Sequence, residues 1–189
     1  MKNVAIFASG SGTNAENIAR YFSKSETVKV AVVLSNNKNV GVHARVNNLG
    51  IPSFVFSREE FVEGTSVLAK LAEYQADLIV LAGFMNKISD ALLKAYPGKI
   101  INIHPALLPK HGGKGMYGMH VHEAVVAAGD KESGITIHYI NENYDEGDII
   151  FQAKCEVLPT DSPDAVATKV HKLEYTHYPH VIEEVLKKI

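Results

Sequence analysis

Short apolar runs alternate with amphipathic stretches along the first half of the chain. Runs rich in Val, Ile and Leu are typical of strands that are covered on both faces. They predict strands at residues 3–8, 28–34, 52–56, 77–82 and 99–103. Apolar positions at helical spacing predict helices at residues 14–22, 41–49 and 89–95, and one long helix from the N-cap Ser57 to about Tyr74. Because strands and helices alternate with short connections, we expect an α/β fold with a mostly parallel sheet and right-handed crossovers.

The second half has a different pattern. A Gly-rich stretch at 110–118 precedes a predicted helix at 120–128, and strand patterns follow at 134–140 and 149–157. The connection between these two strands is too short for a crossover helix, so we expect an antiparallel pair. Ser162 and Pro163 open a long final helix, within which Pro179 is expected to cause a kink or an interruption. Its apolar stripe consists of Val166, Val170, Leu173, Val181 and Val185.

The composition is that of an ordinary globular protein and excludes several classes. Of the 189 residues, 46% are apolar and 21% are charged, with a formal net charge of -2. The single cysteine, Cys155, excludes an intramolecular disulfide and a cysteine-based zinc cluster, and it favours a reduced, cytoplasmic location. The sequence has no secretory signal pattern, no apolar run near the roughly 20 residues that span a bilayer, and no basic footprint for nucleic acid. We therefore expect small-molecule chemistry.

A Gly-rich segment, Ser9 to Asn14, separates the first predicted strand from the first helix. Glycines allow a tight turn, and the free N–H groups of the following helix bind anions, so we expect a phosphate site here. Gly10, Gly12 and Ala15 also fit the dinucleotide fingerprint, but no acidic residue ends the second strand, which counts against NAD. The alternative is that the glycines serve only the turn.

Asn102 and His104 stand two apart at the carboxyl end of a predicted central strand, so their side chains face the same way. An amide donor beside an imidazole suits a reaction that builds charge on a carbonyl oxygen and moves a proton. The loop at 141–148 carries four carboxylates, one of which can orient His104 if the loop folds over this strand end. The alternatives are a structural histidine and a solvated turn.

A metal site is not expected. His120 and His122 are two apart on a predicted helix and therefore point to different sides. The sequence contains no pair of cysteines and no His-x-x-x-His spacing. Within the Gly-rich stretch, Lys110 to Gly115 is compatible with a phosphate-binding loop, but we interpret it as a mobile surface loop.

Together, these segments closely resemble the phosphoribosylglycinamide formyltransferase family within the formyltetrahydrofolate hydrolase and transferase superfamily. The resemblance covers essentially the whole chain, in order. The segments that carry it are Ser9 to Asn14, Leu81 to Met85, Asn102 to Lys110, Tyr144 to Gly147, and Leu173 to Tyr175.

The resemblance implies a single Rossmann-like domain over residues 1–189. Residues up to about 100 then serve mononucleotide and phosphate binding, and residues from about 101 carry catalytic and folate-binding elements. The implied catalytic residues are Asn102, His104 and Asp145. The implied ribonucleotide-binding residues are Gly12, Thr13, Asn14 and Glu174, and the implied folate-binding residues are Arg58, Met85, Asn86, Lys87, Ile88 and Asn102.

The family resemblance implies formyl transfer from 10-formyltetrahydrofolate to the amine of glycinamide ribonucleotide in purine biosynthesis, without a metal, by a monomer or homodimer. The members that act on tRNA, or that deformylate the folate, carry an additional domain for which 189 residues leave no room, which favours the ribonucleotide. The alternatives are hydrolysis of the same folate, another folate-dependent formyl transfer, and a nucleotide-binding sensor that uses only the Gly-rich loop.

Overall fold

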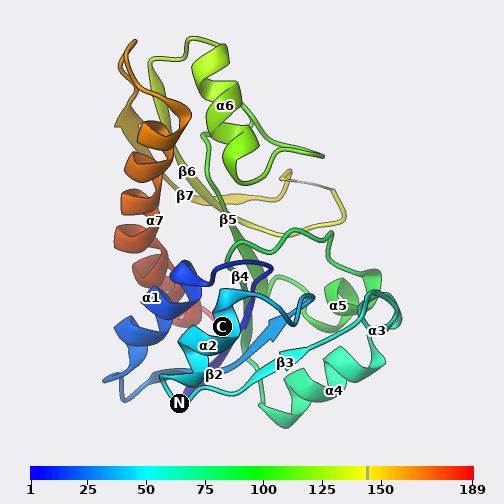
Figure 1. The fold of residues 1–189 in the computed structure, drawn as a ribbon. Coiled ribbons are helices and arrows are strands. Elements are labelled where there is room, and N and C mark those ends of the chain that lie inside the picture. The colour runs from blue at the N-terminus through cyan, green and yellow to red at the C-terminus, as the bar shows by residue number, and fades with distance from the viewer. Residues whose placement is uncertain (144) are drawn as a thin grey trace.

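The computed structural model describes residues 1–143 and 145–189, which build one seven-stranded sheet with helices on both faces (Figure 1). The spatial order of the strands is β3-β2-β1-β4-β5-β6-β7. Strands β1 to β5 pair in parallel, whereas β6 is antiparallel to both β5 and β7. The strands are β1 (Lys2–Phe7), β2 (Val28–Ser35), β3 (Ser53–Val55), β4 (Leu78–Leu81), β5 (Ile100–His104), β6 (Glu132–Tyr139) and β7 (Ile149–Glu156). The expected α/β class and the antiparallel pair are confirmed.

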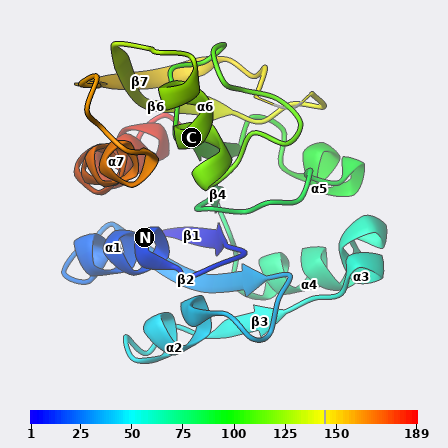
Figure 2. The ribbon, with the colours of Figure 1, turned by 45° about the horizontal axis from the view of Figure 1, so that its top comes forward.

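Two apolar layers hold the helices to the sheet. One layer packs α1, α2, α6 and α7 on one face, and the other packs α3, α4 and α5 on the opposite face (Figure 2). The helices are α1 (Thr13–Phe22), α2 (Gly41–Asn47), α3 (Arg58–Glu63), α4 (Thr65–Glu73), α5 (Asp90–Ala95), α6 (Met119–Ala127) and α7 (Pro163–Leu186). No helix in the described parts of the chain is both long and apolar enough to cross a membrane.

The prediction of one helix from Ser57 to Tyr74 was wrong, because two helices occupy this segment. Ser57 and Glu60 form the expected capping box, and α3 then ends at Gly64. Gly64 has a φ of 79°, a left-handed conformation that ends one helix and allows α4 to begin at once. A side chain at Gly64 would also collide with Ala91, so the close approach of α5 requires glycine at the break.

The expected interruption at Pro179 does not occur, and α7 runs through it from Pro163 to Leu186. Proline removes the N–H that would bond to the carbonyl four residues earlier, which belongs to Tyr175. That carbonyl instead accepts a hydrogen bond of 3.0 Å from Nδ2 of Asn17 on α1. A side chain from the neighbouring helix therefore replaces the missing backbone donor. The predicted apolar stripe of α7 does pack on the sheet, as expected.

Gly134 of β6 permits the close packing of β7 and of the loop that follows β5. A Cβ atom at this position would lie 2.0 Å from the carbonyl oxygen of Ala153 and 2.8 Å from the side chain of Leu107. We expect Gly134→Ala to lower the free energy of unfolding by about 1–3 kcal/mol, the usual cost of overpacking. Urea denaturation measures this cost, and Gly10→Ala, which meets nothing within 4 Å, is the control. An unchanged midpoint for Gly134→Ala would contradict the assignment.

Candidate active site

A cleft of about 630 Å³ opens at the carboxyl ends of the parallel strands. It lies beside the topological switch point, where the strand order reverses, because β1 pairs with β2 on one side and with β4 on the other. The loops that follow these strands diverge here, and α/β sheets bind ligands at such points. Segments 113–119 and 140–145 contribute further residues to the walls.

The N-terminus of α1 forms one end of the cleft. Gly12 precedes the helix with a φ of 78°, and a Cβ at this position would lie 2.5 Å from Val42, so the site requires glycine. No side chain of a described residue caps α1. The N–H groups in the first turn, at Thr13 and Asn14, are therefore available to an anion.

The loop after β4 is tied to the Gly-rich loop after β1. The amide of Ser9 donates to the carbonyl of Gly83 at 3.0 Å, and the amide of Met85 donates to the hydroxyl of Ser9 at the same distance. The ring of Phe84 packs edge-on against Phe7, with the centroids 5.5 Å apart. These contacts hold the side chain of Met85 at the cleft, where it is 53% exposed and offers an apolar surface.

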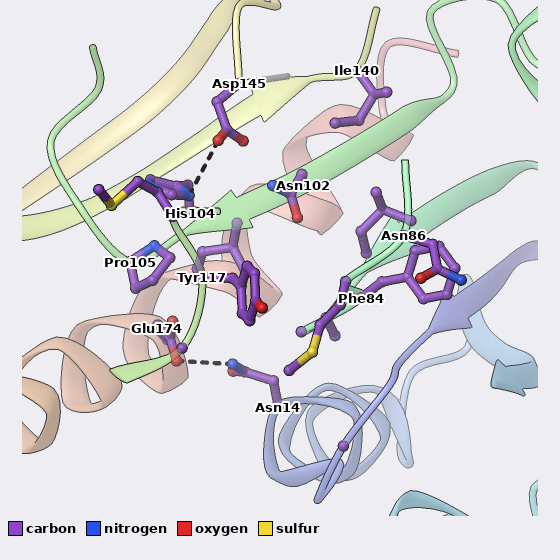
Figure 3. A pocket seen from close by; sticks show the side chains of 18 of the residues that line it. Asn14, Phe84, Asn86, Asn102, His104, Pro105, Tyr117, Ile140, Asp145 and Glu174 are labelled. Atoms are coloured by element: carbon purple, nitrogen blue, oxygen red, sulfur yellow. Dashed lines mark hydrogen bonds and ion pairs between the residues drawn. The ribbon is translucent and has the colours of Figure 1, made fainter. Parts of the chain in front are cut away.

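His104, the last residue of β5, lies between two acceptors, of which Figure 3 shows the Asp145 carboxylate. Its Nε2 donates to the backbone carbonyl of His111 at 2.8 Å, since a carbonyl only accepts. Its Nδ1 lies 3.7 Å from Oδ2 of Asp145, which also accepts from the amide of Gly113 at 2.9 Å. An imidazolium ring at this position has an acceptor facing each N–H, so the arrangement suits a residue that supplies a proton or a positive charge.

His138 of β6, which is fully buried, lies between Asn102 and the same carboxylate. Its Nδ1 donates to the carbonyl of Tyr139 at 3.0 Å, so in the neutral ring Nε2 is an acceptor. Nε2 accepts a hydrogen bond of 3.2 Å from the side-chain amide of Asn102 and lies 3.6 Å from Oδ1 of Asp145. Burial lowers the pKa of His138, which favours this neutral form. The second N–H of the Asn102 amide, for which the described residues provide no partner, is left for a ligand.

The loop after His104 is held to the antiparallel strands. The hydroxyl of Thr136 on β6 donates to the carbonyl of Ala106 at 2.7 Å and accepts from the amide of Leu108 at 3.0 Å. The side-chain amide of Gln152 on β7 donates to both Thr136 and the carbonyl of Leu108. These bonds shape the turn that carries the His111 carbonyl back to His104.

The structure brings nearly all of the residues expected from the sequence to this one cleft. Those that line it are Gly12, Thr13, Asn14, Met85, Asn86, Lys87, Ile88, Asn102, His104, Asp145 and Glu174. Arg58 does not line it, because it is the exposed first residue of α3. The Gly-rich stretch is more than the surface loop expected, since residues 113–118 form a wall of the cleft. Tyr144, part of the acidic loop, lies outside the described residues.

Several residues in or directly behind the cleft were not expected. His138 had a detectable signal, because Thr136 and His138 are polar residues that alternate with Ile135 and Ile137 and therefore share a face of the strand. His122 and His171 had no comparable signal, since each belongs to a helix whose contact with the cleft depends on packing. Among the described residues, no group of three or more His, Cys, Asp or Glu side chains is arranged to hold a metal ion.

Comparisons with known proteins agree with this geometry. Residues 2–182 match the formyl transferase family model. The chain is 37% identical to a Bacillus subtilis phosphoribosylglycinamide formyltransferase, covering 98% of this chain and 95% of that protein. It is also 37% identical to the chloroplastic enzyme of that name from Arabidopsis thaliana, but spans only 66% of its length. The crystal structure of the Bacillus halodurans phosphoribosylglycinamide formyltransferase superimposes with a TM-score of 0.90 at 36% identity, covering 99% of this chain and 96% of that one.

We expect His138 to keep the proton on Nδ1 and to remain neutral as the pH falls below about 6.5, where an ordinary imidazole titrates. The physical reason is the burial that lowers its pKa. The unfolded chain binds the second proton of the imidazole at a higher pH than the folded chain. His138 therefore also makes the free energy of unfolding fall as the pH drops below about 6.5. The ¹⁵N chemical shifts of the ring over a pH series measure its state. A proton on Nε2 at neutral pH would rule out the bond from Asn102.

Proposed function

Because this chain belongs to the formyl transferase family, we propose that it transfers the formyl group of 10-formyltetrahydrofolate to the amine of N1-(5-phospho-D-ribosyl)glycinamide. The products are N2-formyl-N1-(5-phospho-D-ribosyl)glycinamide and tetrahydrofolate, in the biosynthesis of purines. One observation carries the proposal: the Asn102 amide, the His104 imidazole and the Asp145 carboxylate meet in the cleft that the N-terminus of α1 also enters.

The ribonucleotide is assigned to the α1 end of the cleft. Its phosphate accepts hydrogen bonds from the N–H groups around Gly12, Thr13 and Asn14, and the helix dipole favours this negative charge. Glu174 lies next to this end, because its Oε2 accepts a hydrogen bond of 2.9 Å from Asn14. A carboxylate 4% exposed at this position suits recognition of the ribose hydroxyls.

The folate is assigned to the part of the cleft that Met85, Asn86, Lys87 and Ile88 line. A cleft of about 630 Å³ is within the usual range for a ligand of this size, and the apolar side chains suit a flat ring system. We keep Arg58 as a contact for the far end of the folate. Since Arg58 is outside the cleft, this contact requires the folate tail to extend over the surface towards α3.

Asn102 and His104 are proposed to stabilise the oxyanion that forms when the amine attacks the formyl carbon. The free N–H of Asn102 and the protonated imidazole of His104 are the donors, and Asp145 supports the imidazolium. The new bond joins the amine nitrogen to the formyl carbon, and the bond from that carbon to N10 of the folate breaks. The amine loses one proton and N10 gains one, a transfer in which Asp145 takes part, directly or through water. The residues require neither a metal nor a covalent intermediate for these steps.

Asn102→Ala and His104→Ala are expected to lower kcat by about 10²- to 10³-fold, because each removes a donor to the oxyanion. Binding of either substrate should change much less. Steady-state kinetics with both substrates measure this difference, and His120→Ala, an exposed histidine on α6 that does not line the cleft, is the control. Turnover near that of the wild type in both variants would refute the roles assigned to the pair.

Formate release in the absence of the ribonucleotide separates transfer from hydrolysis of the folate. We expect consumption of 10-formyltetrahydrofolate only when glycinamide ribonucleotide is present, since the amine is the nucleophile. The assay compares formate and formylated ribonucleotide with and without that substrate. Formate release at an equal rate without it would make the protein a hydrolase.

A further inference from the structure

Two imidazoles in the cleft are not used by the proposed chemistry. His122 of α6 is 2% exposed, and its Nδ1 is buried without a hydrogen-bond partner among the described residues. His171 of α7 is half-exposed, and its ring lies near that of His122, with the centroids 6.3 Å apart. A buried imidazole with an unsatisfied nitrogen costs free energy unless a ligand or solvent meets it.

The same two residues are connected to the α1 end of the cleft. Nδ1 of His171 donates to Oε2 of Glu174 at 2.8 Å, and the same oxygen accepts from Nδ2 of Asn14 at 2.9 Å. The remaining oxygen of the Asn14 side chain is also buried without a partner among the described residues. The hydrogen bonds therefore run from the first turn of α1 to His171, beside which His122 lies. Polar atoms of Asn14 and His122 have no partner among the described residues.

The charges around the pair favour one cation rather than two in the free protein. The hydrogen bond that His171 donates to Glu174 raises the pKa of His171. Burial lowers the pKa of His122, and the neighbouring His171 lowers it further. Besides His171, the titratable groups that act on His122 are Glu174 of α7, which favours its cation, and His104 of β5, which opposes it. An anion bound beside both rings would offset burial and repulsion together.

We propose that His171 and His122 are part of the binding site for the ribonucleotide phosphate, and that His122 takes up a proton from solvent as the phosphate dianion binds. The inference rests on the proposed function and extends it, because it adds two binding residues and makes substrate binding proton-linked. The N–H groups of α1 then contact one side of the phosphate and the imidazoles another. An exclusively structural role for His122 predicts no such linkage.

Ribose 5-phosphate is the probe, because it carries the phosphate but no amine that titrates. Its affinity is expected to fall about tenfold as the pH rises from about 6.5 to about 8.5, because one charge-assisted hydrogen bond to the phosphate is lost. Calorimetry in two buffers of different ionisation enthalpy should show net proton uptake near pH 7.5. The ligand is not the source of this signal, because selection of its dianion, with a pKa near 6, releases protons rather than taking them up.

His122→Gln keeps a polar side chain without the titrating group and is expected to lose the pH dependence and about tenfold in affinity. His171→Gln is expected to lose about tenfold in affinity and to keep the pH dependence, because His122 remains. His171→Lys should keep both. His120→Gln is the matched control on α6, since His120 is exposed and outside the cleft. Because His171 is half-exposed, its variants remain informative even if His122→Gln does not fold.

A pH dependence or a proton uptake in His122→Gln equal to that of the wild type would overturn the inference. The formyl transfer assay is scored separately on the wild type. If the protein transfers formyl groups but binds ribose 5-phosphate without taking up protons, this inference is contradicted and the proposed function stands. If binding of ribose 5-phosphate takes up protons but no formyl group is transferred, the role of His122 and His171 in phosphate binding is supported and the proposed function is contradicted.

Discussion

The site depends on one constraint: the ring of His104 lies between two acceptors that come from two different loops. The His111 carbonyl reaches Nε2 only because the loop after β5 turns back, and the Asp145 carboxylate reaches Nδ1 only because the loop between β6 and β7 folds over the sheet edge. Both partner residues have positive φ values, 52° at His111 and 55° at Asp145. Such backbone conformations are uncommon outside glycine and cluster at functional sites, where the surrounding fold stabilises them.

The sheet explains why an anion site and a proton-transfer site share one cleft. Strands β1, β4 and β5 are adjacent and parallel, so their carboxyl ends meet at one edge. The loop after β1 leads into the uncapped N-terminus of α1, and β5 ends in His104. The antiparallel strand β6 then adds His138 directly opposite Asn102 in the register. One edge therefore carries the helix dipole, the amide and the imidazoles.

The buried imidazoles have different hydrogen-bond partners. His138 has a backbone acceptor on one nitrogen and an amide donor on the other, and burial lowers its pKa, which favours the neutral form that orients Asn102. His104 has an acceptor facing each nitrogen. His171 is paired with Glu174, whereas nothing among the described residues satisfies Nδ1 of its neighbour His122.

The sequence by itself determined the order of the strands and helices, the antiparallel end of the sheet, the Gly-rich turn, and the shared face of Asn102 and His104, because these follow from local periodicity and backbone geometry. It left the break at Gly64 and the continuity of α7 at Pro179 undetermined, since the first depends on contact with Ala91 and the second on a hydrogen bond from Asn17. Only the tertiary structure brought Asp145 to His104, connected His171 to α1 through Glu174, and placed His122 beside His171. Those contacts join residues that are far apart in the chain, and no local pattern encodes a distance across a fold.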